Sequence, residues 1–347
     1  MFKQGMGIDG LKISHVQGIA TDRERKRMYY SCTDFLAKTD MDGNIIGTVK
    51  GLIGHLGCIA YNYDDGMVYG SLEFKHDSIG KNILENIKKH TGEEKEIQDG
   101  FYIVRFNVDK ITRLDMDAEK DGVMQAVFLG EVFNDYKEDG HRYGCSGIDG
   151  TTFAPLPGEK EGKNYLYVSY GIYGDVTRED NDHQVILRYD LAELEKYFSP
   201  LEQKDMHRKG HKKPGSKYFV YTGNTTYGIQ NLEYCREENC IFCAVYKGKK
   251  PSFPNYFMYV IDLNEKSKTD QLKGLGEVGE RLFLSKNLGI KDEKTQIRGI
   301  DFPYGSTGMI SLGDNYFYFS EDFKNENGFG TKIGLYKFNG VTFERVK

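Results

Sequence analysis

Three histidines stand at or just before the start of similar short segments in this 347-residue chain: His15, His55 and His141. Five such segments occur, at residues 15–20, 55–60, 144–149, 228–233 and 296–301, and each leads into a hydrophobic run. Imidazole nitrogens with an amide oxygen nearby suit a divalent ion such as Mn, Zn or Fe. If the segments converge, we expect the three histidines to bind a metal, with Gln17 or Gln230 as a fourth ligand. The alternative is that they only bond backbone or water.

Further polar side chains in and around these segments supply the rest of a site. A bound ion polarises a carbonyl or carboxylate and acidifies the neighbouring proton. An arginine can then neutralise the substrate's anion, and a tyrosine can move the proton. We expect these catalytic roles for Arg298, Tyr143 and Tyr227. We expect substrate binding by Gln17, Gln230, Arg142 and Ser146.

Carboxylates at equivalent positions of three segments offer a different chemistry. They are Asp149, Glu233 and Asp301, with Glu73 nearby. A glycosidase uses two carboxyl groups as acid and base, and a calcium ion also prefers oxygen ligands. On a regular strand Asp149 faces away from the axis if Ser146 faces it. A carboxylate-dependent hydrolase that uses Asp149, Glu233 or Asp301 as catalytic residues is the alternative to the histidine-centred site.

The recurrence of the segments indicates a repeat architecture. Each segment is followed by a turn and further strand-like runs, and the Asp-Gly pairs at 42–43 and 65–66 are strong hairpin signals. About four strands in each of five units is typical of a β-propeller. We predict an all-β fold with one domain, residues 1–347, forming a single five-bladed propeller with each segment as an innermost strand. The expected four-stranded blades are 15–51, 55–131, 144–223, 227–285 and 298–347, with the last closing near the N-terminal segment.

Two local patterns refine this prediction. After Asp77 and Ser78, isoleucine and leucine at helical spacing predict a short helix inserted in blade 2. Cys240 and Cys243 lie three residues apart on a predicted strand, so their side chains face opposite sides and are expected to be structural thiols. A shorter helical turn is expected around residues 190–197.

The composition of the chain bears on which kinds of partner the protein can bind. The net charge is -5 and 29% of residues are charged, which gives no argument for nucleic-acid binding. No stretch approaches the roughly 20 apolar residues that span a bilayer. The six cysteines and the polar N-terminal segment favour a reduced, cytoplasmic protein with no membrane partner. The oligomeric state is not indicated.

The repeated units resemble those of β-propeller repeat proteins, although the segments lack the Trp-Asp ending of the common propeller repeat. In residue types the predicted mouth resembles oligouronate lyases and gluconolactonase-type propellers. This resemblance implies a metal-assisted, lyase-like enzyme with a divalent ion (Mn, Zn, Fe or Ca) and a small carbohydrate or uronate-type substrate. The alternatives are a carboxylate-dependent glycoside hydrolase or lactonase, and a non-catalytic ligand-binding or scaffold propeller.

Overall fold

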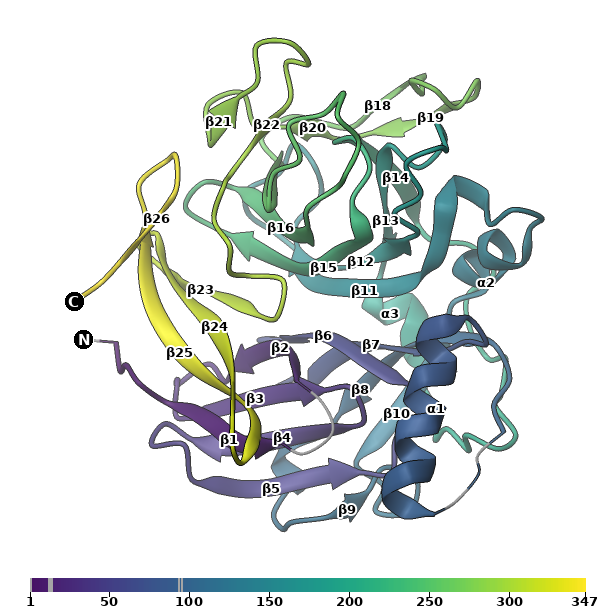
Figure 1. Ribbon diagram of the computed structural model, residues 1–347, viewed down its shortest axis with the longest axis vertical. Coiled ribbons are helices and arrows are strands. Elements are labelled where there is room, and N and C mark those ends of the chain that lie inside the picture. The colour runs from purple at the N-terminus through teal and green to yellow at the C-terminus, as the bar shows by residue number, and fades with distance from the viewer. Residues whose placement is uncertain (1, 12–14, 93, 95) are drawn as a thin grey trace.

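Short apolar runs separated by tight turns make β-strand the main regular structure of this chain, and five of its sheets surround a central axis (Figure 1). The structure is a computed structural model that describes residues 2–11, 15–92, 94 and 96–347. The arrangement is a five-bladed β-propeller of mostly four-stranded antiparallel blades, which confirms the predicted fold class. Radial repetition of this kind leaves few exposed sheet edges.

The first two blades follow the predicted strands closely. Blade 1 consists of β2 (Val16–Thr21), β3 (Arg27–Cys32), β4 (Phe35–Asp40) and β5 (Ile45–Lys50), and β9 (Met116–Asp117) pairs with β5. Blade 2 consists of β6 (His55–Tyr61), β7 (Val68–Phe74), β8 (Gly100–Phe106) and β10 (Met124–Phe128).

Blades 3 and 4 have the same order, innermost strand first. Blade 3 consists of β11 (Cys145–Ala154), β12 (Tyr165–Ile172), β13 (His183–Tyr189) and β14 (Ser216–Tyr221), and is extended by β19 (Val278–Arg281) and β18 (Lys268–Gln271). Blade 4 consists of β15 (Thr226–Cys235), β16 (Cys240–Tyr246), β17 (Met258–Asp262) and β20 (Phe283–Leu284).

Blade 5 joins the two ends of the chain. It consists of β23 (Met309–Gly313), β24 (Tyr316–Asn325), β25 (Gly328–Phe338) and the N-terminal β1 (Gly7–Leu11), and β26 (Phe343–Arg345) also pairs with β25. Because β1 pairs with β25 through Ile8 and Thr331, the N-terminal segment completes the last blade. The expected closure near the N-terminus is confirmed.

The predicted innermost strand of blade 5 is wrong. The segment 296–301 contains only β22 (Arg298–Gly299), which pairs with β21 (Ile290–Lys291) in a separate two-stranded ribbon. Ile300 bridges to Met258 of blade 4. The stretch Phe302-Pro303-Tyr304-Gly305 follows, and proline and glycine do not continue a strand ladder. The innermost strand is β23, which packs against β2 and β15.

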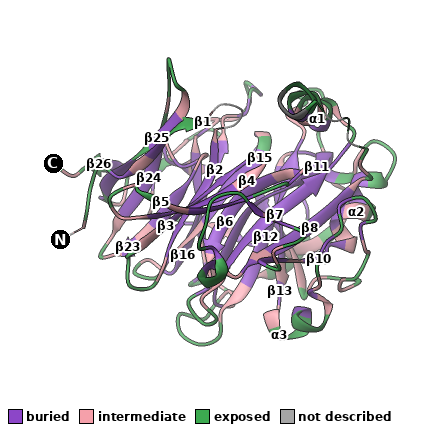
Figure 2. Cartoon of the chain, turned by 90° about the horizontal axis from the view of Figure 1, so that it is seen from below, coloured by how far each residue is buried: buried purple, intermediate pink, exposed green. Residues whose placement is uncertain are grey.

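The hydrophobic core lies between the blades. Five clusters of buried side chains each join two neighbouring blades, including blades 5 and 1. Tyr29 packs toward blade 2, whereas Tyr30 packs toward blade 5, so both faces of a blade are buried. Figure 2 shows buried residues along the strands and exposed residues in the loops.

The cysteine prediction is confirmed by the same clusters. Cys240 belongs to the core between blades 4 and 5, and Cys243 to the core between blades 3 and 4. All six cysteines are buried. The two thiols of the Cys-x-x-Cys sequence therefore face opposite sides of one strand.

The helical segments are insertions between strands. They are α1 (Ser78–Thr91), α2 (Gly130–Lys137), α3 (Leu191–Leu194) and the 3₁₀ turns Val108–Lys110, Arg142–Gly144 and Glu195–Tyr197. The predicted helix in blade 2 is α1, and an Asp77 side-chain oxygen accepts a hydrogen bond from the Gly80 N–H, 2.9 Å away. Among the described residues, the helices are all too short or too polar to cross a bilayer.

Candidate functional site

The first four predicted segments do begin innermost strands, and their side chains tie the strands together at the axis. The Asn231 amide of β15 donates to the Gln17 carbonyl of β2 and to the Ser306 carbonyl before β23, each 2.9 Å away. The Asp149 carboxyl of β11 accepts from the Cys58 N–H of β6, at 3.0 Å. The starts of the innermost strands therefore form one mouth of the propeller, which we call the axial mouth.

Two of the three predicted histidines meet at the axial mouth. The Gln17 side-chain nitrogen lies 3.3 Å from Nε2 of His15 and donates to Thr33 Oγ1, 3.2 Å away. Burial lowers the pKa of His15, and the neighbouring His55 lowers it further. His15, Gln17 and His55 thus share one partly buried environment.

The carboxylate of Glu73, from the second strand of blade 2, lies next to His55 on the side away from the mouth. Glu73 Oε1 lies 3.6 Å from His55 Nδ1 and 2.6 Å from Lys75 Nζ. Lys75 also donates to the Ser146 carbonyl, 2.9 Å away. The side chains of Glu73 and Lys75 are each 5% exposed, whereas that of His55 is 13% exposed. The histidine is therefore the member of this group that reaches the mouth.

The buried pair is charged. Burial opposes ionisation of Glu73, but the charge of Lys75 and the proximity of His55 outweigh it and hold the pKa of Glu73 below its usual range. Burial opposes the charge on Lys75 too, yet Glu73 and Asp77 raise the pKa of Lys75 above its usual value. His55 therefore faces a carboxylate rather than a carboxylic acid.

Glycines in the repeated segments let these carboxyl groups approach the neighbouring backbone. Glu73 Oε2 accepts from the Ile148 N–H, 3.0 Å away. Gly147 next to it has φ 130°, and a Cβ there would lie 1.9 Å from the same oxygen. At Gly57, a Cβ would lie 2.2 Å from Asp149 Oδ1. Side chains at these two positions would displace both carboxyl groups.

Asp149 differs from Glu73 in its ionisation. It is 6% exposed, and burial raises its pKa to about 7. The proximity of His55 opposes this rise, and the negative charge of Glu73 adds to it. The register of β11 shifts on both sides of Ile148, which interrupts strict alternation. The carboxyl group of Asp149 accordingly reaches β6, while Ser146 Oγ packs near Gly171 of β12.

The structure does not bring His141 to the other two histidines. Its Nδ1 lies 2.7 Å from the Tyr136 carbonyl, and its ring packs between Tyr136 and Tyr173 at 4.8 and 5.1 Å. Within residues 2–11, 15–92, 94 and 96–347, His, Cys, Asp and Glu side chains form no group of three or more suited to a metal ion. The predicted three-histidine site is not formed, because α2 and the turn after it direct His141 toward Tyr136.

Two predicted catalytic residues lie outside the axial mouth. Arg298 donates to the Gly289 carbonyl at 2.8 Å within the β21–β22 ribbon. Asp301 pairs with Lys247 at 2.7 Å. Both were expected at the axis because segment 296–301 resembles the others, and both are displaced because that segment is not an innermost strand.

Arg142 and Tyr143 also point elsewhere. Arg142 pairs with Glu277 at 2.8 Å and stacks on the Tyr143 ring at 4.9 Å. Tyr143 is buried, its ring 5.1 Å from that of Phe219, and burial raises its pKa above the usual range. Tyr143 therefore belongs to the packing of blade 3, and Arg142 is exposed beside it.

Tyr227 and Gln230 do lie at the axial mouth. Tyr227 is 46% exposed, and the Gln230 side chain donates to its carbonyl at 3.1 Å. The Tyr227 ring lies 6.3 Å from that of Tyr246, a residue that sequence reasoning missed. Burial raises the pKa of Tyr246 to about 12, and Asp149 is near enough to contribute. Tyr246 ends the second strand of blade 4, and Glu73 lies at the corresponding end of the second strand of blade 2. This equivalence between blades could have identified Tyr246 from the sequence.

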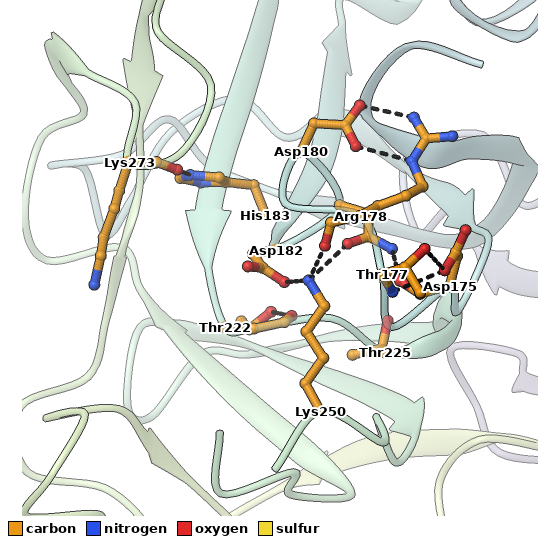
Figure 3. A network of polar contacts seen from close by, with 12 residues as sticks. Asp175, Thr177, Arg178, Asp180, Asp182, His183, Thr222, Thr225, Lys250 and Lys273 are labelled. Atoms are coloured by element: carbon orange, nitrogen blue, oxygen red, sulfur yellow. Dashed lines mark hydrogen bonds and ion pairs between the residues drawn. The ribbon is translucent and has the colours of Figure 1, made fainter. Parts of the chain in front are cut away.

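A second buried polar network lies in the loops between blades 3 and 4 (Figure 3). Lys250 Nζ donates to Asp182 Oδ1 at 2.5 Å, to Asn181 Oδ1 at 3.0 Å and to the Arg178 carbonyl. An ammonium group has three donors, and these three acceptors satisfy all of them. This network is closed and holds the loop 174–182 against blade 4.

Comparisons with known proteins give no family. No protein-family model matches the sequence, and no curated protein matches it. Among solved structures, the chain is similar to a gluconolactonase from Xanthomonas campestris, with 10% sequence identity and a TM-score of 0.38 over 92% of this chain and 72% of that chain. Likeness at this level carries no argument about activity.

Proposed function

We propose that this protein is a hydrolase that uses general acid–base catalysis on a small carbohydrate-class substrate, of the sugar-lactone kind, at the axial mouth. The observation that supports this proposal is the group formed by His55, Glu73 and Asp149. Two carboxyl groups beside one histidine have pKa values that are shifted in opposite directions. Such a separation is a mark of assigned acid and base roles.

His55 is the proposed base. Its Nδ1 faces the Glu73 carboxylate, so Nε2 is the nitrogen that would face a substrate. At 3.6 Å the Glu73 carboxylate makes no hydrogen bond to the ring, but its charge stabilises the imidazolium that forms when His55 accepts a proton. His55 would take a proton from water, and the resulting hydroxide would attack the lactone carbonyl. Lys75 keeps Glu73 ionised during this step.

Asp149 is the proposed acid. Its pKa of about 7 leaves it largely protonated in slightly acidic solution. Because Oδ1 accepts from the Cys58 N–H, the proton belongs on Oδ2. That proton would pass to the ring oxygen that leaves as the lactone opens. The amide of Gln17 and the hydroxyl of Tyr227 would bind substrate hydroxyls at the mouth.

Hydrolysis is better supported than lyase chemistry. Elimination from a uronate needs a cation to neutralise the substrate carboxylate, and Arg298, expected in that role, lies in the β21–β22 ribbon. The three-ligand metal site that would share the task is also not formed by the described residues. The proposed mechanism therefore uses no metal ion.

A non-catalytic propeller is the second candidate, and one observation favours it. Glu73 and Asp149 each accept a hydrogen bond from the backbone of a neighbouring innermost strand, at 3.0 Å. Both carboxyl groups can thus serve to lock adjacent blades without any chemistry. This reading predicts ligand binding at the mouth with no turnover.

The test is a set of assays on the purified protein and matched variants. Aldonolactones would be followed by acid release, aryl glycosides by phenolate release, and uronate oligomers by the absorbance of the unsaturated product. We expect lactone hydrolysis by the wild type, loss in His55→Ala, and no change in His211→Ala, which alters a histidine in the loop 204–213. Lactone binding without turnover would support the scaffold reading, and unsaturated product would support the lyase.

A further inference from the structure

The opposite end of the axis has a cavity of its own. It has a volume of about 520 Å³ and is lined by the later residues of all five innermost strands, including Ala20, Ala60, Thr152, Glu233 and Ser311. Small-molecule sites usually measure about 300–1,000 Å³ and combine apolar walls with a few polar groups. The described residues that line this cavity include no histidine, so its chemistry differs from that of the axial mouth.

A carboxyl group that retains its proton lines this cavity. Glu233 Oε1 accepts from the Ser311 N–H at 2.7 Å, and burial raises the pKa of Glu233 to about 8. A carboxylic acid that is neutral at pH 7 can donate a hydrogen bond to a ligand oxygen. Glu233 is thus a donor in neutral solution and becomes an acceptor in alkaline solution.

Positive charge predominates around the carboxyl group. The lining includes the cations Arg23, Arg25, Lys160 and Arg236, together with Asp64 and Glu237. The Arg23 guanidinium donates to the Tyr63 carbonyl, and that of Arg25 to the Leu312 carbonyl. A guanidinium has five donors, so one such bond fixes each group and leaves others for an anion.

Aromatic rings form one wall. Tyr61 is stacked on Tyr29 with ring centres 6.1 Å apart, and Tyr63 lies edge-on to Tyr61 at 5.2 Å. Burial raises the pKa of Tyr63 to about 12, with contributions from Glu233 and Arg25. Tyr63 therefore lies within electrostatic range of both the acid and the guanidinium.

We infer that this cavity is a second ligand-binding site, which takes a small sugar acid. Its carboxylate would bind to Arg25 and Arg23, a hydroxyl would accept from Glu233, and the apolar face of its ring or chain would pack on Tyr63. The inference is independent of the proposed hydrolase activity, since it uses no residue of the axial mouth.

The experiment is isothermal titration calorimetry with D-gluconate at pH 7. We expect wild-type protein to bind, and Arg25→Gln to bind at least about tenfold more weakly, because a charge-assisted hydrogen bond is lost. Arg25 is exposed, and glutamine tolerates its positive φ no worse than arginine, so the variant should fold. His55→Ala should bind like the wild type, which separates this site from the axial mouth.

The pH dependence provides a second readout. Between pH 7 and 9 wild-type binding should weaken as Glu233 ionises, whereas Glu233→Gln should bind equally at both values. The other charged and titratable groups that line the cavity are the tyrosines Tyr61, Tyr63 and Tyr234, the cations Arg23, Arg25, Lys160 and Arg236, and the carboxylates Asp64 and Glu237. Tyr63, whose pKa is raised to about 12, keeps its proton between pH 7 and 9.

Three outcomes would overturn the inference. Equal binding by Arg25→Gln and wild type would show that the guanidinium is not part of a site. Loss of binding in His55→Ala would place gluconate at the axial mouth instead. Acetate binding as tight as gluconate would show an unselective anion site rather than one for sugar acids.

Discussion

Two buried lysines illustrate how similar ion pairs can serve different ends. Lys75 pairs with Glu73 at 2.6 Å, and Lys250 pairs with Asp182 at 2.5 Å. Both lysine side chains are less than one-tenth exposed. The other acceptors of Lys250 are an amide and a backbone carbonyl, so its network ends within the loops. The network of Lys75 continues through Glu73 to His55, which reaches the axial mouth.

This difference separates a buried ion pair that only stabilises the fold from one that is linked to a titratable group at a candidate site. A buried ion pair loses hydration, and only good geometry with further hydrogen bonds compensates for that loss. The Lys250 network meets this requirement and fixes a loop. The Lys75 network meets this requirement too. It also includes the imidazole of His55, which is partly exposed, and the carboxyl group of Asp149 nearby has a pKa raised to about 7. Under the proposed mechanism, only the second arrangement moves a proton.

The largest expected difference between the Lys75 and Lys250 networks is at His55. We expect His55→Ala to lower kcat/KM for the lactone by about a thousandfold, the usual scale for loss of a general base. The melting temperature should change little, because the ring is partly exposed. Steady-state kinetics and thermal denaturation would test this, and unchanged kinetics would contradict the role of base.

Replacing each lysine by methionine sharpens the comparison. Lys75→Met and Lys250→Met each leave a buried carboxylate without its partner, which typically costs about 3–5 kcal/mol of unfolding free energy. Urea denaturation would measure both losses. Only Lys75→Met should also reduce turnover per folded molecule, and an equal loss of turnover in Lys250→Met would remove the distinction between the networks.

The pH dependence of stability gives a third test. Burial raises the pKa of Asp149 from 3.8 to about 7, so the native state binds a proton that the unfolded chain releases. The contribution of Asp149 is therefore fully favourable below about pH 4 and is lost as pH rises to about 7. With about 1.4 kcal/mol per pKa unit, the loss is at most about 4 kcal/mol. Asp149→Asn should remove this slope from urea-derived unfolding free energies, and a retained slope would contradict it.

The smallest effect is expected from a bond that belongs to neither network. Ser31 Oγ of blade 1 donates to the Gly57 carbonyl of blade 2, 2.6 Å away. Ser31→Ala should lower the unfolding free energy by about 1 kcal/mol and leave kinetics unchanged, since a typical hydrogen bond contributes about that much. The exposed Ser252→Ala is the matched control, and equal stabilities of the two variants would show that the inter-blade bond contributes nothing.

Much of the fold could be predicted from the sequence because the signals are local. Turn residues such as Asp42-Gly43 and the alternation of side chains define hairpins within about ten residues. The innermost strands of blades 1 to 4, the helix α1 and the opposite orientation of Cys240 and Cys243 are all of this kind. Segment 296–301 carries the same local pattern, yet β23 takes its place because the ring must close between β15 and β2.

The site could be predicted only in part. The positions of His15, His55, Gln17 and Gln230 follow from the repeated segments, since equivalent strands of a propeller meet at one axis. The placement of His141 and Arg298 does not follow, because loops and an outer ribbon direct them. The sequence by itself determined the repeats, the innermost strands of blades 1 to 4 and the axial positions of His15, His55, Gln17 and Gln230. Tertiary structure alone decided which carboxyl group is ionised, because that depends on burial and on the distance to charges contributed by other strands.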